Sequence, residues 1–289
     1  MIFKINERQN IFNDNIAYIQ QWNFSRANLN EKSRIEAITL IASICYQNKK
    51  ALNSDSLYNR LMAESSGLPS SSFEFVPILF DMFKLNGFLR EKGIKKEDTN
   101  MFKYGEKIEN RKYLLTNFRA IIYDKEKFGI DFTKHFNTEE ECEIIAKHFK
   151  VFKAHIDLPT FGQMVRHRVN WQVVSRRYVS GKKMPFEFYI SEKMSNVKSG
   201  LYKSILYDGQ IDDISTENII NICLEHYYAS LEAGVKPEEA RRIIPQACYT
   251  TAWFAMQPKQ LDNFFKLRLH KTSQWEIQQT AIAMQELIK

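Results

Sequence analysis

The sequence has few cysteines and lacks the spacings that usually hold a metal. Its four cysteines, Cys45, Cys142, Cys223 and Cys248, are far apart and form no Cys-x-x-Cys pair. A zinc site or a disulfide framework is therefore not expected. The six histidines show no His-x-His or His-Glu-x-x-His spacing, so we expect no metal. Cys223 and Cys248 lie in apolar helical stretches, which favours core packing over nucleophilic catalysis.

Long hydrophobic runs are also absent. No stretch of about 18 apolar residues, the length that a membrane helix needs, occurs in the chain. The N-terminal residues MIFKINERQN contain no apolar core of the signal-peptide kind. From these absences we expect a soluble cytoplasmic protein that does not bind membranes. Repeats and low-complexity linkers are missing too, which favours a single domain over residues 1–289.

The composition is that of a folded protein with a positive charge balance. Its 289 residues are 44% hydrophobic and include 21 Phe and 13 Tyr, enough for a sizeable core. The net charge is +7 and the pI is about 9.0. A basic balance suits anionic ligands such as nucleotides, folates or nucleic acid. A lysine-rich solvated surface is the alternative explanation, and charge alone does not decide between them.

Hydrophobic spacing predicts a mixture of helices and strands, which indicates the α+β class. Residues 91–112 carry many charges and few large apolar side chains, so we expect an exposed connection or insertion there. Residues 112–124 (KYLLTNFRAIIYD) predict a strand or a helix entry. The predicted helices cover residues 31–46, 54–63, 138–149, 214–232 and, without a break, the last 30 residues. The predicted strands cover 151–157 and 184–190.

The segment RHRVNWQVVSRRY, residues 166–178, gathers positive charge in an apolar stretch. Arg166, His167 and Arg168 are adjacent and repel one another, so an anion is expected to neutralise them. The planar fork of donors on arginine suits phosphate oxygens. If the following SRRYV is extended, Ser175 and Arg177 project to one face and form a phosphate clamp. A basic helix end at the surface is the alternative. We favour a binding site for phosphate-bearing ligands.

A second group of arginines lies in the C-terminal third. Arg241 and Arg242 follow two glutamates, and one of them can pair with Glu238 while the other stays free. Arg268 lies among apolar residues in FFKLRLHK. Because an unpaired buried charge is costly, Arg268 is expected to have a partner. That partner is either a structural acid such as Glu276 or a ligand.

Together these motifs resemble those of the flavin-dependent thymidylate synthases. The hallmark of that family is an Arg-His-Arg triplet, a short spacer and Ser-x-Arg-Tyr, as in residues 166–178. The preceding Gln163 fits the pattern, and SSFEFV at residues 71–76 is a weaker match. The C-terminal pattern is also present as ARRIIP, YTTAWF, LDNFFKLRL and SQWEIQQ. The resemblance covers roughly residues 35–80 and 150–289, and it leaves residues 82–150 as an insertion in the first half.

The resemblance implies particular site residues. Arg268 is implied to lie against the uracil ring and to stabilise charge there, which makes it the catalytic residue. Arg241 is implied to reach the nucleotide from a neighbouring subunit. The residues implied to bind dUMP are Gln163, Arg166, Ser175, Arg177, Arg241 and Arg268. The residues implied to bind FAD are Arg166, His167, Arg168, Gln172, Gln257, Lys259, Asn263 and Leu267.

The resemblance also implies a fold and a reaction. The fold would be α+β, with a central and mostly antiparallel sheet flanked by long helices, in a homotetramer whose active sites are shared between subunits. The reaction would be reductive methylation of dUMP to dTMP without an enzymic cysteine nucleophile. FAD would be the cofactor, methylenetetrahydrofolate the carbon donor and NADPH the reductant. Nucleic acid is not an expected partner.

The sequence departs from the family pattern near the implied flavin site. The spacer after the triplet is one residue shorter, with Gln172 where Asn is usual and Val173 where an acid is usual. Phe75 and Thr272 each replace a histidine, Gln257 replaces Asn, and Lys259 replaces Arg. These departures leave two alternatives open. One is an enzyme of the same fold with an altered nucleotide product, as in hydroxymethylation, and the other is a non-catalytic homologue that binds nucleotides or RNA.

Overall fold

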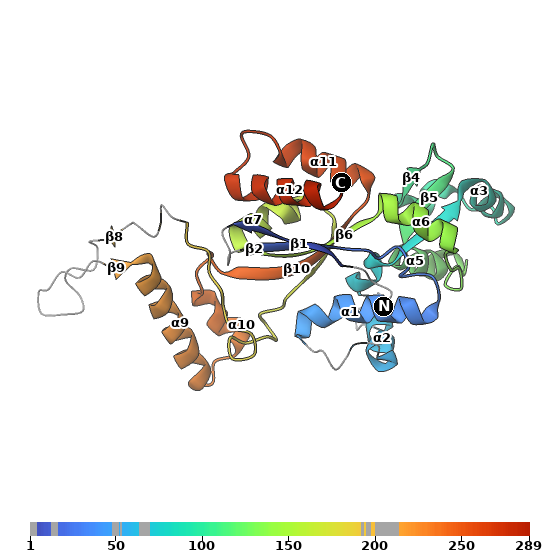
Figure 1. The fold of residues 1–289 in the computed structure, drawn as a ribbon. Coiled ribbons are helices and arrows are strands. Elements are labelled where there is room, and N and C mark those ends of the chain that lie inside the picture. Colours follow the sequence, from blue (N-terminus) through green and yellow to red (C-terminus); the bar gives the residue numbers. More distant parts are fainter. Residues whose placement is uncertain are drawn as a thin grey trace, which may run out of the picture.

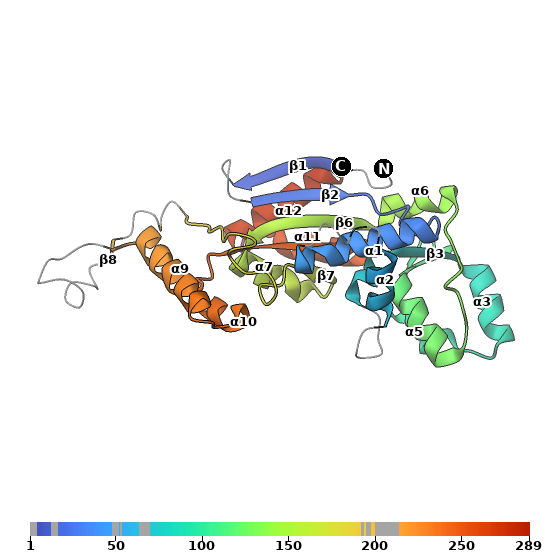
Figure 2. The same ribbon diagram turned by 90° about the horizontal axis from the view of Figure 1, so that it is seen from below.

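A computed structural model describes residues 5–12, 17–47, 52, 54–63, 70–191, 194, 198–199 and 214–289. The centre of the fold in this part of the chain is a five-stranded antiparallel sheet in the order β1-β2-β6-β10-β7 (Figures 1 and 2). The strands are β1 (Ile5–Phe12), β2 (Ala17–Trp22), β6 (Lys150–Asp157), β7 (Asn170–Val173) and β10 (Tyr249–Met256).

The two neighbouring strands β6 and β10 divide the interior into two cores. They pair without a break from Tyr249 opposite Asp157 to Met256 opposite Lys150. Alternate side chains of a strand point to opposite faces. Phe152 and Phe254 therefore enter one hydrophobic core, while Val151 and Trp253 enter the other. Because all eight residues of β10 are buried, apolar residues occupy both of its faces.

Helices cover both faces of this sheet. On one face lie α7 (Leu158–Met164), α11 (Pro258–Arg268) and α12 (Trp275–Leu287), whose apolar residues join Phe152 and Phe254 (Figure 1). On the other lies α1 (Glu31–Tyr46), beside α2 (Asp55–Met62). Asn30 caps α1, and its side chain accepts a hydrogen bond from the Ser33 amide at 2.9 Å. The functional residues discussed below lie around the edges of this layered body.

Residues 71–148 contain a second, smaller sheet with its own helices. Its order is β3-β5-β4, antiparallel throughout. The elements are η2, a 3-10 turn at Ser71–Phe75, β3 (Pro77–Asp81), α3 (Met82–Glu91), η3 (Lys96–Asp98), α4 (Asn100–Lys103), β4 (Glu106–Ile108), β5 (Tyr113–Asn117), α5 (Phe118–Phe128) and α6 (Glu139–His148). Its buried residues, including Leu115 and Phe118, belong to the same hydrophobic core as α1. The expected exposed connection at 91–112 is therefore partly folded and attached to the main body.

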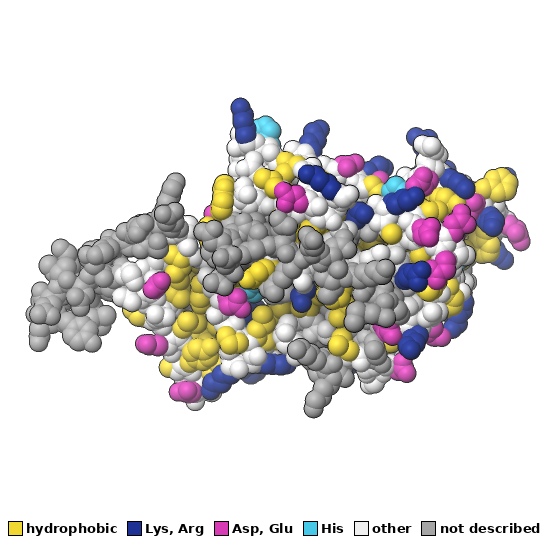
Figure 3. All heavy atoms as spheres, in the orientation of Figure 1, with side chains coloured by type: hydrophobic (Ala, Val, Ile, Leu, Met, Phe, Trp, Pro, Cys, Tyr) yellow, Lys and Arg dark blue, Asp and Glu magenta, His cyan; other side chains and the backbone are white. Residues whose placement is uncertain are grey.

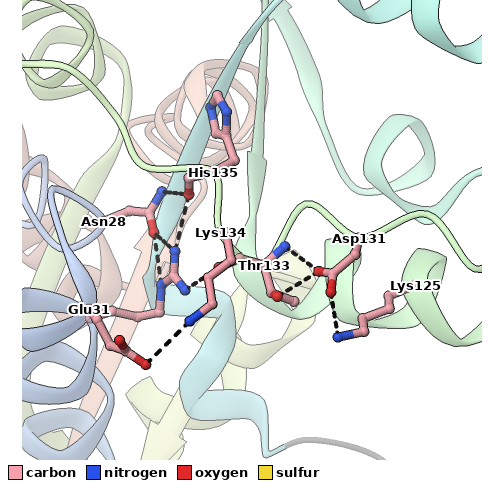
Figure 4. Close-up of polar contacts among 8 residues, drawn as sticks. Asn28, Glu31, Lys125, Asp131, Thr133, Lys134 and His135 are labelled. Carbon is pink, nitrogen blue, oxygen red and sulfur yellow. Dashed lines mark hydrogen bonds and ion pairs between the residues drawn. The ribbon is translucent and has the colours of Figure 1, made fainter.

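A buried arginine fastens this part to α1. The Nε of Arg34 donates to the Oδ1 of Asn28 at 2.9 Å, and its guanidinium also donates to the carbonyl oxygens of Thr133 and His135 at 2.6 and 3.1 Å (Figure 4). The guanidinium lies 3.9 Å from the ring centroid of Phe118. Burial lowers the pKa of Arg34 to about 10, so the group is still charged at neutral pH. These contacts replace water around a charge that is otherwise costly to bury.

A helical arm extends from the opposite end of the sheet (Figures 1 and 2). It contains β8 (Lys198–Ser199), β9 (Ile214–Ser215), α9 (Thr216–Glu232), α10 (Pro237–Ala240) and the 3-10 turn η6 (Arg241–Ile243). The Tyr227 hydroxyl accepts a hydrogen bond from the Gly181 amide at 3.0 Å and so attaches α9 to the body. Apolar side chains remain exposed along the arm, namely Ile219, Ile222 and Ile243 (Figure 3). No helix in the described part of the chain has the length and apolar character that crossing a membrane requires.

Most local predictions are confirmed. The fold is α+β with a central antiparallel sheet, as expected. Helix α1 covers the predicted residues 31–46, and α6 lies within the predicted residues 138–149, where Thr138 and Glu141 form a capping box. Gly234 follows α9 with a φ of +85°, the left-handed conformation that ends helices. Whether the chain is one domain and whether residues 82–150 are an insertion stay predictions.

Two local predictions are wrong. Residues 184–190 were expected to be a strand, but in this range only Phe188 forms a bridge, with Cys248. Pro185, near the start of this range, has no amide hydrogen for a ladder. The last 30 residues were expected to be one helix, but α11 and α12 are separated by a break at 269–274. In the break the Ser273 hydroxyl donates to the Leu267 carbonyl at 2.9 Å, a side-chain bond that competes with helical pairing.

Candidate functional site

The Arg-His-Arg triplet lies at the end of α7, where the chain turns into β7. Asp157 caps the start of α7 by accepting a hydrogen bond from the Thr160 amide. The helix tightens into η4, a 3-10 turn at Val165–His167, and Arg168 then takes a left-handed φ of +47°. This change of direction separates the triplet. Arg166 and Arg168 are exposed, and the half-buried His167 lies between them in sequence.

His167 and Arg268 contact each other directly. The Nε of Arg268 donates to the Nε2 of His167 at 2.7 Å. The Arg268 guanidinium also donates to the Gln163 carbonyl at 3.0 Å, and the Gln163 side-chain amide donates to the Oε1 of Gln274 at 2.5 Å. The partner expected for Arg268 was either an acid such as Glu276 or a ligand. Arg268 instead contacts the neutral ring of His167 and the amide oxygens of Gln163. Among the described contacts, no carboxylate neutralises this arginine.

The electrostatics of this pair favour one protonation state. Burial and the neighbouring Arg268 lower the pKa of His167 to about 4. The ring is therefore neutral at pH 7, and the proton lies on Nδ1, because Nε2 accepts the bond from Arg268. Burial and the charge of Arg166 lower the pKa of Arg268 from its ordinary value. Two arginines close together without an acid form a local excess of positive charge, which an anionic ligand would relieve.

A cavity of about 500 Å³ lies beside the other end of the triplet. Three predicted site residues line it: Arg168, Gln257 and Lys259. The wall facing them comes from the smaller sheet and its helices, through Lys103, Tyr104, Arg119 and Tyr123 among others. Its volume is within the range of pockets that hold small ligands.

Specific hydrogen bonds hold the two walls of the cavity together. The Nε2 of Gln257 donates to the Tyr104 carbonyl at 3.0 Å. The Lys259 amide, in the first turn of α11, donates to the Oε2 of Glu106 at 3.0 Å. The Asn170 side chain donates to the Glu74 carbonyl at 3.0 Å and closes one end. Gln257 and Glu106 are both buried, so these contacts define the shape of the cavity.

The exposed face of α11 leads from the cavity toward Arg268. Lys259, Asn263 and Leu267 follow each other at intervals of four residues and are all exposed. The side chain of Leu267 is 51% accessible, which is unusual for a leucine on a helix that packs against a sheet. The predicted flavin contacts on this helix therefore share one open face.

The second half of the phosphate motif has a different conformation from the expected one. Ser175 to Tyr178 form a turn in which the Tyr178 amide donates to the Ser175 carbonyl at 3.0 Å, so the extended clamp is wrong. Arg177 is exposed, and its Nε donates to the Oε2 of Glu238 at 2.7 Å. Glu238 was expected to pair with Arg241 or Arg242, and the competing partner is Arg177. This pair brings the Ser175 turn next to the helical arm.

The predicted nucleotide residues therefore fall into two groups. One group, Gln163, Arg166 and Arg268, lies with α7 and α11 on one face of the five-stranded sheet. The other, Ser175, Arg177 and Arg241, lies with α10 beyond the opposite face (Figure 1). Among the described residues no hydrogen bond or ion pair joins the two groups.

Gln172 lies apart from the cavity that Arg168 lines. It stands opposite Trp253 in the sheet, and its Oε1 accepts a hydrogen bond from the Cys45 thiol at 3.3 Å. All four cysteines are thiols and not disulfides. Burial raises the pKa values of Cys142 and Cys248 to about 11. These two thiols are protonated at neutral pH and are poor nucleophiles.

The sequence reasoning missed the far wall of the cavity. Lys103, Tyr104, Arg119 and Tyr123 were not among the predicted site residues. One signal was available, because Arg119 lies in the apolar run KYLLTNFRAIIYD just as Arg268 lies in FFKLRLHK. It also missed Gln274, which lies in the SQWEIQQ motif and contacts Gln163.

The fold and the site define an α+β protein with clustered arginines and a cavity lined by cations. Residues 129–289, more than half of the chain, match the family described as thymidylate synthase complementing protein. The chain belongs to this family, which confirms the resemblance found in its motifs.

Individual relatives carry the name flavin-dependent thymidylate synthase. One from Thermotoga neapolitana is 33% identical over 144 residues, covering 48% of this chain and 62% of the relative. One from Kosmotoga olearia is 33% identical over 150 residues, covering 48% and 63%. One from Saccharolobus solfataricus is 30% identical over 128 residues, covering 44% of each. The chain thus spans less than two thirds of the length of the curated relatives it matches.

A solved structure is also similar. It is described as the UMP/dUMP methylase PolB from Streptomyces cacaoi bound with 5-Br UMP. It has 21% sequence identity and a TM-score of 0.37, covering 48% of this chain and 67% of that one.

Proposed function

We propose that this protein is an FAD-dependent enzyme that reductively methylates dUMP to dTMP, with methylenetetrahydrofolate as carbon donor and NADPH as reductant. The observation that carries the proposal is the environment of Arg268. Its guanidinium is oriented by His167 and Gln163, and no described carboxylate pairs with it. This arrangement, in a member of this family, supports a role toward an anionic nucleotide.

Arg268 is the proposed catalytic residue. A guanidinium held by neutral partners keeps its full charge for a ligand, whereas pairing with an acid would cancel it. Placed against the pyrimidine, it would stabilise negative charge that develops on the ring during reaction, which is electrostatic preorganisation. His167 keeps the guanidinium in one orientation, because its Nε2 occupies the Nε–H donor. The remaining donors can then face the substrate.

The cavity beside Arg168 fits a flavin dinucleotide. Four cations line it, Lys103, Arg119, Arg168 and Lys259, against two carboxylates, Glu74 and Glu106. The two excess positive charges suit a diphosphate, which carries two negative charges at neutral pH. When bound, reduced FAD would supply the reducing equivalents. Arg168, Gln257 and Lys259 would hold it there, with Asn263 and Leu267 along α11 and Arg166 and His167 beside them.

Two features support active sites shared between subunits of a homotetramer. The nucleotide residues of one chain form two groups on opposite sides of the sheet, so a second copy is needed to complete a site. Ser175, Arg177 and Arg241 of one subunit would hold the nucleotide phosphate, while Gln163, Arg166 and Arg268 of another would face the base. The exposed apolar residues of the arm, among them Ile219 and Ile222, offer a surface for such a partner.

The thiols support a route without a cysteine nucleophile. Cys248 directly precedes β10. The positive charge of Arg176 lowers the pKa of this thiol, but burial has the larger effect and raises the pKa to about 11. Cys142 has the same shift for the same reason. Carbon transfer would therefore depend on the orientation of the bound ligands and on Arg268.

The experiment is direct. Purified protein is examined for flavin absorbance and then assayed with dUMP, methylenetetrahydrofolate and NADPH, with the nucleotide product identified by mass. We expect yellow protein and dTMP. A yellow protein that makes a hydroxymethylated nucleotide would correct the product, whereas a colourless protein that takes up no FAD would overturn the flavoenzyme proposal in favour of a non-catalytic nucleotide-binding protein.

A further inference from the structure

The cavity beside Arg168 has walls of different origin. Arg168, Gln257 and Lys259 lie within residues 129–289, the part that matches the family. Lys103 and Arg119, on the facing wall, lie outside it, in the smaller sheet and its helices. Half of the cations that line the cavity therefore come from a part of the chain that the family match does not cover.

The facing wall is arranged around charged and aromatic groups. The Arg119 guanidinium donates to the Oε1 of Glu74 at 2.6 Å, and it lies 5.3 Å from the ring centroid of Tyr123. The Lys103 ammonium lies 5.3 Å from the ring centroid of Tyr104. Each cation is thus placed beside an aromatic ring. Cations next to rings match ligands in which phosphate groups are joined to planar bases.

The wall is also held in a fixed position. The amides of Asn100 and Met101, at the start of α4, donate to the buried carboxylate of Asp124 at 2.6 and 2.8 Å. These two bonds connect α4, which carries Lys103, to α5, which carries Arg119. Gly105 packs against the backbone of α4. A Cβ added at this position would come within 2.3 Å of the Met101 carbonyl oxygen. The two cations are therefore presented by a packed framework.

We propose that Lys103 and Arg119 form a diphosphate subsite, and that residues 100–123 thereby supply one wall of the dinucleotide site in this protein. The inference rests on the proposed function for the identity of FAD as the natural occupant. The ligand class itself, a base-bearing diphosphate, follows from the two excess positive charges and the two rings. Tyr104 and Tyr123 also line the cavity, and aromatic rings suit the planar parts of such a ligand.

The subsite also accounts for departures from the family pattern. Gln257 contacts the Tyr104 carbonyl, and the Lys259 amide contacts Glu106. Phe75 is fully buried in the core that includes Leu115 and Phe118. The Gln257 side chain therefore contacts this added wall and Phe75 shares its core, whereas the contact at position 259 is made by the backbone amide. Lys259 stands where the family pattern has an arginine, so position 259 supplies only an ammonium to the cavity. Arg119 supplies a planar guanidinium from the facing wall.

The test measures binding by isothermal titration calorimetry with two probes, FAD and ADP. The variant Lys103→Gln/Arg119→Gln removes both charges, and glutamine at 119 can still donate to Glu74. We expect the Kd for both probes to rise about tenfold or more, as expected for lost charge-assisted bonds. The matched control is Lys107→Gln, because Lys107 is an exposed lysine of the same region that does not line the cavity. Its affinities should stay within about twofold of wild type.

The outcomes separate this inference from the proposed function. Unchanged FAD and ADP affinities in a double variant with a wild-type melting temperature overturn the subsite and leave the proposed function standing. Wild-type protein that binds ADP but not FAD, with ADP affinity lost in the double variant, supports the subsite and overturns the flavin proposal. Wild-type protein that binds neither probe overturns both. If the double variant fails to fold, the exposed Lys103→Gln alone decides, with a loss of about threefold expected.

Discussion

The Nε of Arg268 and the Nε2 of His167 lie 2.7 Å apart, with the arginine as donor. A protonated histidine could not accept this bond, so the pair exists only while His167 is neutral. Burial and Arg268 itself keep it neutral by lowering its pKa to about 4. The geometry of the proposed catalytic arginine therefore depends on the protonation state of a neighbouring ring.

This dependence predicts a change of stability with pH. Between the ordinary pKa of 6.5 and the folded value of about 4, the unfolded chain binds a proton at His167 that the folded chain does not. The free energy of unfolding therefore falls as pH drops through this window. His167→Gln removes the titrating group, so its melting temperature should decline less steeply between pH 6.5 and pH 4. The exposed His226→Gln is the control, and equal slopes in all three proteins would contradict the assignment.

Arg268→Ala should lose turnover without losing the fold. Removing a charge that acts on the transition state costs about 100-fold or more in kcat. Lys266→Ala, an exposed cation two residues earlier on α11, is the matched control and should retain activity. Steady-state dTMP formation and thermal melts measure the two properties. Near-normal activity of Arg268→Ala would refute the role given to it.

The proposed sharing of active sites between subunits predicts complementation between inactive variants. Arg268→Ala damages one group of nucleotide residues and Arg177→Ala the other, so each protein alone should be nearly inactive. Mixed tetramers should recover about a quarter of wild-type activity, because random assembly leaves that share of sites intact. The two variants are refolded or co-expressed together and then assayed. No recovery in verified mixed oligomers would mean that both groups serve one site within a chain.

Two glycines near the smaller sheet should change the free energy of unfolding in opposite directions when each is replaced by alanine. At Gly105 a Cβ would lie 2.3 Å from the Met101 carbonyl oxygen and 3.1 Å from that of Leu115. Gly105→Ala should therefore lower the free energy of unfolding by about 1–3 kcal/mol through overpacking. Gly87, exposed in α3 with nothing within 4 Å of its added Cβ, should gain about 0.5–1 kcal/mol as alanine. Urea titrations of the two variants measure both changes.

The buried Arg34 predicts a large loss of stability on substitution. Arg34→Met would leave the Thr133 carbonyl and the Asn28 Oδ1 without their donor, and the His135 carbonyl would keep only its bond from the Asn28 side-chain amide. We expect the free energy of unfolding to fall by about 3 kcal/mol, since each buried unsatisfied group is costly. Arg26→Ala, which breaks an exposed pair with Glu139, should cost less than about 1 kcal/mol. A similar loss in both variants would show that burial of Arg34 is not the cause.

Local signals in the sequence predicted local structure well. The Thr138–Glu141 capping box and Gly234 act over one helical turn, so the helix ends they mark can be read directly from neighbouring residues. The motif residues Gln163, Arg168 and Arg268 were predicted for a similar reason, since the family pattern keeps their order along the chain. Their partners belong to other elements and could not be found this way.

The failures depend on contacts between distant segments. A strand at 184–190 needs a neighbour to pair with over its length, and only Phe188 forms a bridge, to Cys248. Arg177 pairs with Glu238, 61 residues away, and the chain from Ser175 forms a turn where an extended segment was predicted. The far wall of the cavity was missed because Arg119 and Arg168 are brought together by the packing of the smaller sheet. No spacing in the sequence records that packing.

Glu106 places a carboxylate at the start of α11, beside the cavity. A free helix N-terminus collects inorganic phosphate and sulfate, both plentiful in cells. Here the Lys259 amide at the start of α11 already donates to the Glu106 carboxylate. A small anion would have to displace a negative charge held in the protein, whereas a dinucleotide that touches both walls need not compete for that position. The proposed dinucleotide should therefore stay bound amid millimolar phosphate, and the cavity would be protected from the commonest competing anions around it.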